Sequence, residues 1–96
     1  MNEQDIIEEV KKIIQKHRSN SEYSIALFGS QARGEQYAGS DIDIGILGKN
    51  SVPYEIMVKI IEEKDDLPTL RKIDIVDLQS VDATFREDVL SYAKRV

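Results

Sequence analysis

Two short stretches decide the fold and the chemistry of this chain: LFGSQARG at residues 27–34 and SDIDI at residues 40–44. A Gly-Ser pair ends the first apolar run, and two aspartates separated by one residue lie in the second. Because alternate residues of a strand point to the same face, Asp41 and Asp43 are expected to project side by side. Two adjacent carboxylates repel each other unless a cation lies between them. The spacing therefore predicts a pair of carboxylates that binds a cation.

The chemistry of these groups indicates a metal-bound phosphate. Hard oxygen ligands suit Mg²⁺, which binds through one or two carboxylates plus the phosphates of a substrate. A turn at Gly29 and Ser30 offers backbone N–H groups to such a phosphate. In the alternative interpretation, the Gly-Ser pair is a surface turn and the two aspartates mark a solvated strand end. The fixed spacing of all four residues favours the site.

Both stretches resemble the signature of the DNA polymerase β-like nucleotidyltransferase superfamily, in particular its minimal nucleotidyltransferase (MNT) branch. Residues 72–78, KIDIVDL, resemble the strand that carries the third carboxylate of that superfamily. The similarity runs from the first expected strand to the end of the chain. It implies the nucleotidyltransferase fold, with a mixed sheet.

The composition of the chain excludes several kinds of protein and argues against some partners. A chain of 96 residues predicts one small domain over residues 1–96, and the absence of cysteine excludes disulfides and zinc–thiolate sites. No apolar run approaches the ~20 residues of a membrane span, and the polar N-terminus is unlike a signal peptide, so a cytoplasmic location is expected. The net charge of −5, with scattered basic residues, argues against a long nucleic acid as partner of this chain alone.

Hydrophobic periodicity predicts an α/β fold with three central strands and about four helices, and the resemblance implies that the three-stranded sheet is mixed. Helical patterns alternate with short apolar runs, at residues 3–18 (helix), 23–28 (strand), 31–36 (short helix), 41–47 (strand), 53–66 (helix), 73–78 (strand) and 83–96 (helix). Asp82 is expected to cap the last helix, whose apolar stripe is Phe85, Val89, Tyr92, Ala93 and Val96. The apolar stripe expected on the helix before it is Tyr54, Met57, Val58, Ile60 and Ile61. His17 and the acidic segment at residues 62–66 are expected to be solvated helix ends.

Strand parity assigns the carboxylates to faces. Three isoleucines at alternate positions, Ile42, Ile44 and Ile46, should pack inward and leave the two aspartates on the opposite face. In the last strand Asp74 and Asp77 fall on opposite faces. Asp74 lies inside the apolar run, as the third carboxylate of the superfamily does, whereas Asp77 is nearer the strand end and expected to be solvated. The pattern favours Asp74.

The resemblance implies a role for each site residue. Asp41 and Asp43 would bind the Mg²⁺ that chelates the triphosphate of ATP, and Asp74 would complete a second Mg²⁺ site and help to deprotonate the attacking hydroxyl. The remaining residues would handle phosphate: Gly29 allows close approach of the backbone, Ser30 donates hydrogen bonds, Arg33 grips phosphate, and Ser40 orients the loop.

The resemblance also implies a partner. Larger members of the superfamily carry a domain that holds the acceptor, and a chain of 96 residues is expected to lack room for one. MNT chains, such as the MntA-type antitoxins, pair with helical HEPN ribonuclease toxins, which implies transfer of AMP from ATP to a toxin tyrosine. A noncatalytic antitoxin of the same fold, and nucleotide transfer to a small molecule, stay open as alternatives. A domain of this size is also expected to pair with its partner or with a second copy.

Overall fold

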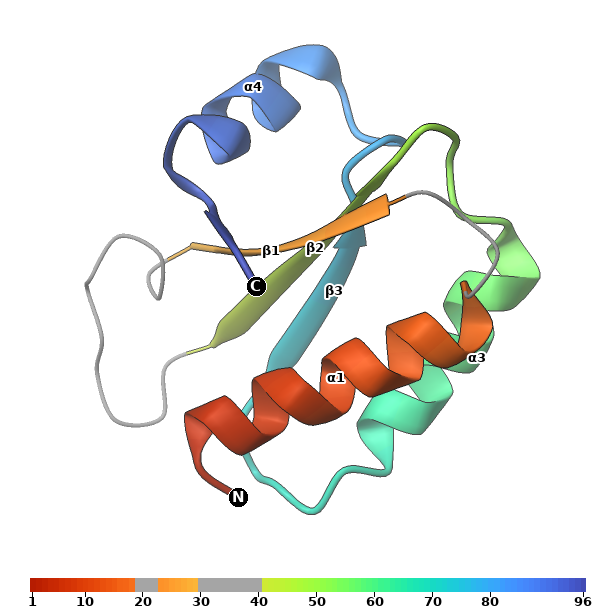
Figure 1. Ribbon diagram of the computed structural model, residues 1–96, viewed down its shortest axis with the longest axis vertical. Coiled ribbons are helices and arrows are strands. Elements are labelled where there is room, and N and C mark those ends of the chain that lie inside the picture. The colour runs from red at the N-terminus through yellow and green to blue at the C-terminus, as the bar shows by residue number, and fades with distance from the viewer. Residues whose placement is uncertain (19–22, 30–40) are drawn as a thin grey trace. The chain divides into compact units, whose positions relative to one another are not determined.

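The computed structural model describes residues 1–18, 23–29 and 41–96 (Figure 1). The chain forms two compact units. The helical unit comprises residues 1–21 and 53–70, and the sheet unit comprises residues 22–52 and 71–96. The short helix expected at residues 31–36 lies outside the described residues. In the described part of the chain, no helix is long and apolar enough to cross a membrane.

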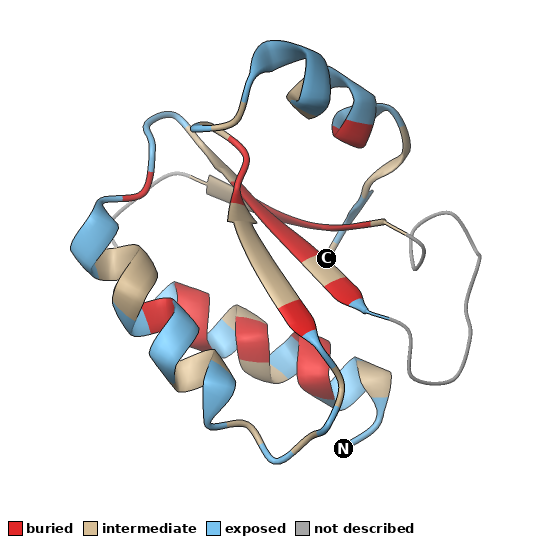
Figure 2. Cartoon of the chain, turned by 180° about the vertical axis from the view of Figure 1, so that it is seen from behind, coloured by how far each residue is buried: buried red, intermediate tan, exposed pale blue. Residues whose placement is uncertain are grey.

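The helical unit packs α1 (Glu3–His17) against α3 (Tyr54–Asp65). The side chain of Asn2 caps α1 by accepting a hydrogen bond from the backbone N–H of Asp5 at 2.8 Å. The apolar stripe expected on α1 is buried, as the red positions of Figure 2 show: Ile6, Ile7, Val10, Ile13 and Ile14. Pro53 was expected in the first turn of α3, but it is the residue just before the helix, which begins at Tyr54.

Two expectations for the helical unit are confirmed only in part. Of the stripe expected on α3, Ile60 is fully buried and Met57 and Val58 are half-buried, whereas Tyr54 and Ile61 are exposed. In the acidic segment Glu62, Asp65 and Asp66 are exposed, as expected, whereas Glu63 and the ring of His17 are half-buried. The ring of His17 pairs with Glu63, and Lys16 Nζ reaches Glu63 Oε1 at 2.8 Å.

The sheet unit contains four strands in the order β3-β2-β1-β4. β2 (Ile42–Gly48) runs parallel to β3 (Ile73–Asp77) and antiparallel to β1 (Tyr23–Phe28), so the sheet is mixed, as the family resemblance implies. The expected sheet had three strands, and the short β4 (Lys94–Arg95) adds a fourth by pairing antiparallel with β1.

The last helix is shorter than expected. α4 runs from Ala83 to Tyr92, and its cap is the predicted one, since Asp82 accepts from the N–H of Phe85 at 3.0 Å. Beyond α4 the backbone is extended, and the N–H of Val96 donates to the carbonyl of Ile25 at 3.0 Å. Val96 therefore belongs to the sheet edge and not to the helical stripe.

The two faces of the sheet differ as parity predicts. Ile42, Ile44 and Ile46 are fully buried on one face. On the other, Phe28 packs with Leu78 and with Val89 of α4, forming a small apolar core. A Cβ at Gly45 would lie 2.5 Å from Leu78 Cδ1, so only glycine permits this close packing. Asp43 lies on the same face as this core, next to its edge.

Candidate active site

Strand register brings the predicted carboxylates together. The parallel pairing of β2 with β3 places Asp43 directly beside Asp74, and residues paired in this way project to the same face. Asp41 comes just before β2 and lies on the same side by parity. On its other flank Asp43 pairs with Phe28, the last residue of β1. One end of the sheet therefore carries three carboxylates from two adjacent strands.

The charges at this end of the sheet are poorly compensated within the described residues. Asp43 is half-buried, and this burial raises the pKa of its carboxyl group; Asp74 and Asp41 raise that pKa further. Lys72 acts in the opposite direction, as the smallest of these influences. Because the carboxylates repel one another, the ionised site favours an added cation.

Lys72 is the residue of this site that sequence reasoning missed. Its Nζ lies 4.0 Å from Asp41 Oδ2 and 3.9 Å from Asp74 Oδ2, which makes it a bridge between the two strands. The signal in the sequence is a basic residue two positions before the third carboxylate. That position alone does not indicate contact with Asp41, because the contact depends on how the strands are aligned.

Gly29 makes room for the central carboxylate. Its φ is +72°, a conformation that other residues rarely adopt. A Cβ built at Gly29 would lie 2.1 Å from Asp43 Oδ2, which is far inside contact distance. Sequence reasoning expected glycine here so that the backbone could approach phosphates. The structure adds a second requirement, since any side chain at this position would displace Asp43.

The donor set fits a hard divalent cation. The described residues contain no three His, Cys, Asp or Glu side chains that already surround one cation position. Asp41, Asp43 and Asp74 nevertheless supply carboxylate oxygens alone, on one sheet face, with the charge of Asp43 disfavoured by its surroundings. Mg²⁺ binds sites of this kind through few protein ligands and completes its coordination with substrate phosphates.

Asp77 does not join the site, and the expectation that it is solvated is wrong. It is buried, and its Oδ2 accepts from the N–H of Val52 at 2.7 Å while its Oδ1 accepts from the N–H of Gln79 at 3.0 Å. These bonds tie the segment after β2 to the end of β3. The choice of Asp74 as the partner of Asp43 agrees with this arrangement.

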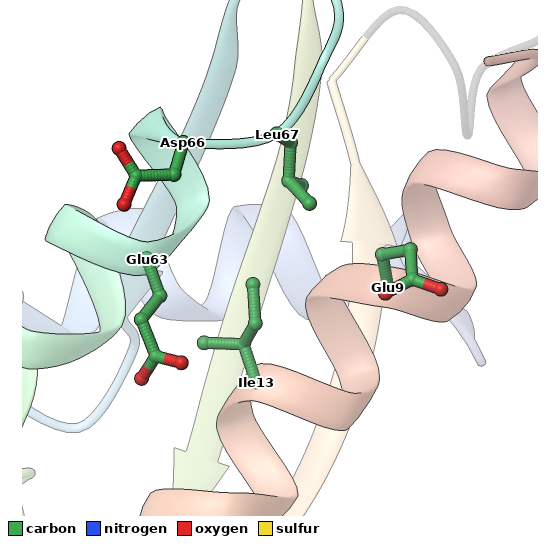
Figure 3. A pocket seen from close by; sticks show the side chains of 5 residues that line it. All are labelled: Glu9, Ile13, Glu63, Asp66 and Leu67. Carbon is green, nitrogen blue, oxygen red and sulfur yellow. The ribbon is translucent and has the colours of Figure 1, made fainter.

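The remaining predicted phosphate ligands, Ser30, Arg33 and Ser40, lie outside the described residues, and their roles stay predictions. A separate open pocket of 270 Å³ lies in the helical unit (Figure 3). Its described lining comes from both helices and the turn after α3: Glu9, Ile13, Glu63, Asp66 and Leu67. None of the predicted site residues is among them.

Comparison with known proteins gives matches over most of the chain. The family described as Polymerase beta, Nucleotidyltransferase matches residues 8–96. A Methanocaldococcus jannaschii protein named "Putative protein adenylyltransferase MJ1379" is 38% identical over 82 residues, which cover 78% of this chain and 81% of that protein.

Solved structures agree with the fold. A chain from a crystal structure of a toxin–antitoxin with AMP-PNP has a TM-score of 0.66 and 26% identity, over 98% of this chain and 72% of that one. A chain described as "Structure of putative minimal nucleotidyltransferase" has a TM-score of 0.73 at 21% identity, over 100% of this chain and 97% of that one. The second likeness concerns the fold.

Proposed function

The chain belongs to the polymerase beta nucleotidyltransferase family, and we propose that it transfers AMP from ATP to a hydroxyl group of a partner protein. The observation that carries the proposal is the register of β2 and β3, which pairs Asp43 with Asp74 beside Asp41. Three carboxylates on one face could hold the two metal ions that clamp the attacking and leaving oxygens during nucleotidyl transfer.

Asp41 and Asp43 would hold the Mg²⁺ that accompanies the triphosphate, and Asp74 would complete the site of a second ion. Bound there, the ions would neutralise charge on the attacking and leaving oxygens of an in-line displacement. The hydrogen-bond ladder between β2 and β3 fixes the spacing of Asp43 and Asp74, although their charges repel.

In the proposed reaction, the acceptor oxygen forms a bond to the α-phosphorus of ATP. The bond between that phosphorus and the oxygen leading to the β-phosphate breaks, and pyrophosphate leaves. The hydroxyl proton passes to a carboxylate oxygen of Asp74, which has 42% of its side chain exposed and so can meet an incoming group. Ser30 and Arg33 are proposed to hold the phosphates.

The proposed acceptor is a tyrosine of a HEPN-type toxin. Two similarities support a protein acceptor: the relative named as a protein adenylyltransferase and the toxin–antitoxin structure with AMP-PNP. The net charge of −5 supports it too, because an acidic chain is poorly suited to a nucleic acid acceptor.

The test uses the full chain together with its co-purified partner, ATP labelled at the α-phosphate and Mg²⁺. We expect label on the partner, and intact-mass spectrometry should show a gain of one or more AMP units. Asp43→Asn should remove the label, whereas Asp65→Asn, which changes an exposed aspartate paired with Lys64, should retain it. A partner that is inhibited yet unmodified would contradict the proposal and favour a noncatalytic antitoxin.

A further inference from the structure

Lys72 combines a fixed backbone with an exposed side chain. Its carbonyl oxygen accepts a hydrogen bond from the N–H of Ile42 at 2.9 Å, so its backbone is joined to β2 between Asp41 and Asp43. Its side chain is 68% exposed. The ammonium group is therefore tethered at the site but able to move within the reach of a long side chain.

The ammonium group of Lys72 supplies positive charge to the carboxylates that a metal ion would bind. It lies about equally far from Asp41 Oδ2 (4.0 Å) and Asp74 Oδ2 (3.9 Å), which come from different strands. Both distances are at the long end for an ion pair, so the lysine neutralises the carboxylates without binding tightly to either. A divalent cation bound to the same oxygens would repel the ammonium group.

We propose that Lys72 is the resident counter-ion of the metal-free site and competes with the divalent cation for Asp41 and Asp74. The inference rests on the proposed function, because it takes these carboxylates as metal ligands. When a metal–nucleotide complex arrives, the triphosphate offers the displaced ammonium group a new anionic partner, and lysine binds phosphate as a point charge. Metal binding then depends on the nucleotide. Lys72 acts through the carboxylates of Asp41 and Asp74, so it is a positioning residue.

The experiment measures Mn²⁺ binding to the full chain by calorimetry, with and without AMP-PNP. Without nucleotide, Lys72→Gln should bind Mn²⁺ about fivefold more tightly than the natural chain, the size expected for loss of an exposed ion pair. With AMP-PNP the advantage should disappear or reverse. Lys72→Arg should behave as the natural chain does. Lys49→Gln, which changes an exposed lysine in the turn after β2, controls for net charge and should leave the affinity unchanged.

The outcomes separate this inference from the proposed function. If Asp43→Asn abolishes Mn²⁺ binding while Lys72→Gln binds as the natural chain does, or more weakly, the counter-ion role is overturned and the metal site stands. If Asp43→Asn leaves Mn²⁺ binding intact, or if neither the natural chain nor any variant binds Mn²⁺ even with AMP-PNP, both are overturned. Circular dichroism of each variant in EDTA establishes that the fold is retained.

Discussion

The two aspartates of β3 lie in opposite surroundings. Asp77, at the end of the strand, is buried and accepts hydrogen bonds from two backbone N–H groups. Asp74, near the start, faces Asp43 and has a distant lysine at 3.9 Å. Glu63 in the helical unit resembles Asp77, since Lys16 and His17 both pair with it. Among the described residues, Asp77 and Glu63 have close hydrogen-bond or ion-pair partners, whereas Asp41 and Asp74 have only Lys72 as an ion-pair partner, at 3.9–4.0 Å.

Replacing each of the two β3 aspartates separately by asparagine should give the largest difference between the two kinds of carboxylate. Asp74→Asn should reduce AMP transfer by more than about 100-fold. Loss of a residue that only supports a metal ligand already reduces activity or metal affinity by about 10–100-fold. The Asp74→Asn variant should leave thermal stability nearly unchanged. Asp77→Asn should do the reverse, lowering the free energy of unfolding by about 1–3 kcal/mol because one buried N–H loses its acceptor. Labelled-ATP transfer and denaturant unfolding measure the two effects, and equal losses of transfer would contradict the division.

Gly29→Ala should disturb both properties at once. The φ of +72° and the clash of a new Cβ with Asp43 Oδ2 predict a loss of about 1–3 kcal/mol in the free energy of unfolding and a loss of Mn²⁺ affinity. Gly45→Ala is the matched control: its Cβ meets Leu78 at 2.5 Å, so it should cost about 1–3 kcal/mol through overpacking without weakening Mn²⁺ binding. Equal effects of both variants on metal binding would mean that Gly29 serves only the fold.

Asp43→Asn should stabilise the metal-free chain slightly. Because the pKa of Asp43 is raised above its usual 3.8 by burial, Asp74 and Asp41, ionising it costs the folded state more than the unfolded state. In EDTA near neutral pH the variant should therefore melt a few degrees higher, about 1–3 °C. The gap should close as the pH falls through the raised pKa towards 3.8. Melting curves across this range would contradict the account if the gap widened at low pH.

Glu63→Gln should give the smallest effect, with the opposite pH dependence. Hydrogen bonds from Lys16 and His17 lower the pKa of Glu63 below its usual 4.5, so its ionised form stabilises the fold at neutral pH. The variant should show a small decrease in melting temperature that vanishes as the pH falls from 4.5 through the lowered pKa. Added salt should shrink the decrease at neutral pH, and AMP transfer should be unaffected.

The sequence pattern predicted those features of the fold that depend on residues close together in the chain. β1 has the expected bounds of 23–28, and parity alone separated Asp74 from Asp77. The misses depend on contacts between distant segments. The burial of Asp77 arises from a bond to Val52, 25 residues away, and the contacts of Lys72 depend on the alignment of β3 with β2. The sequence did not predict β4, because the helical spacing of apolar residues in α4 continues past Tyr92.

The most direct test of the proposed role of the three sheet-end carboxylates is a calorimetric titration of the full chain with ATP, in Mg²⁺ and in EDTA. The account predicts that ATP and Mg²⁺ bind together, with ATP affinity about tenfold or more lower in EDTA, a common size for coupled ligands. Asp43→Asn should lose the increment due to Mg²⁺, and Asp65→Asn should keep it. Tight ATP binding in EDTA that Mg²⁺ leaves unchanged would contradict the claim that Asp41, Asp43 and Asp74 form a metal-bridged nucleotide site.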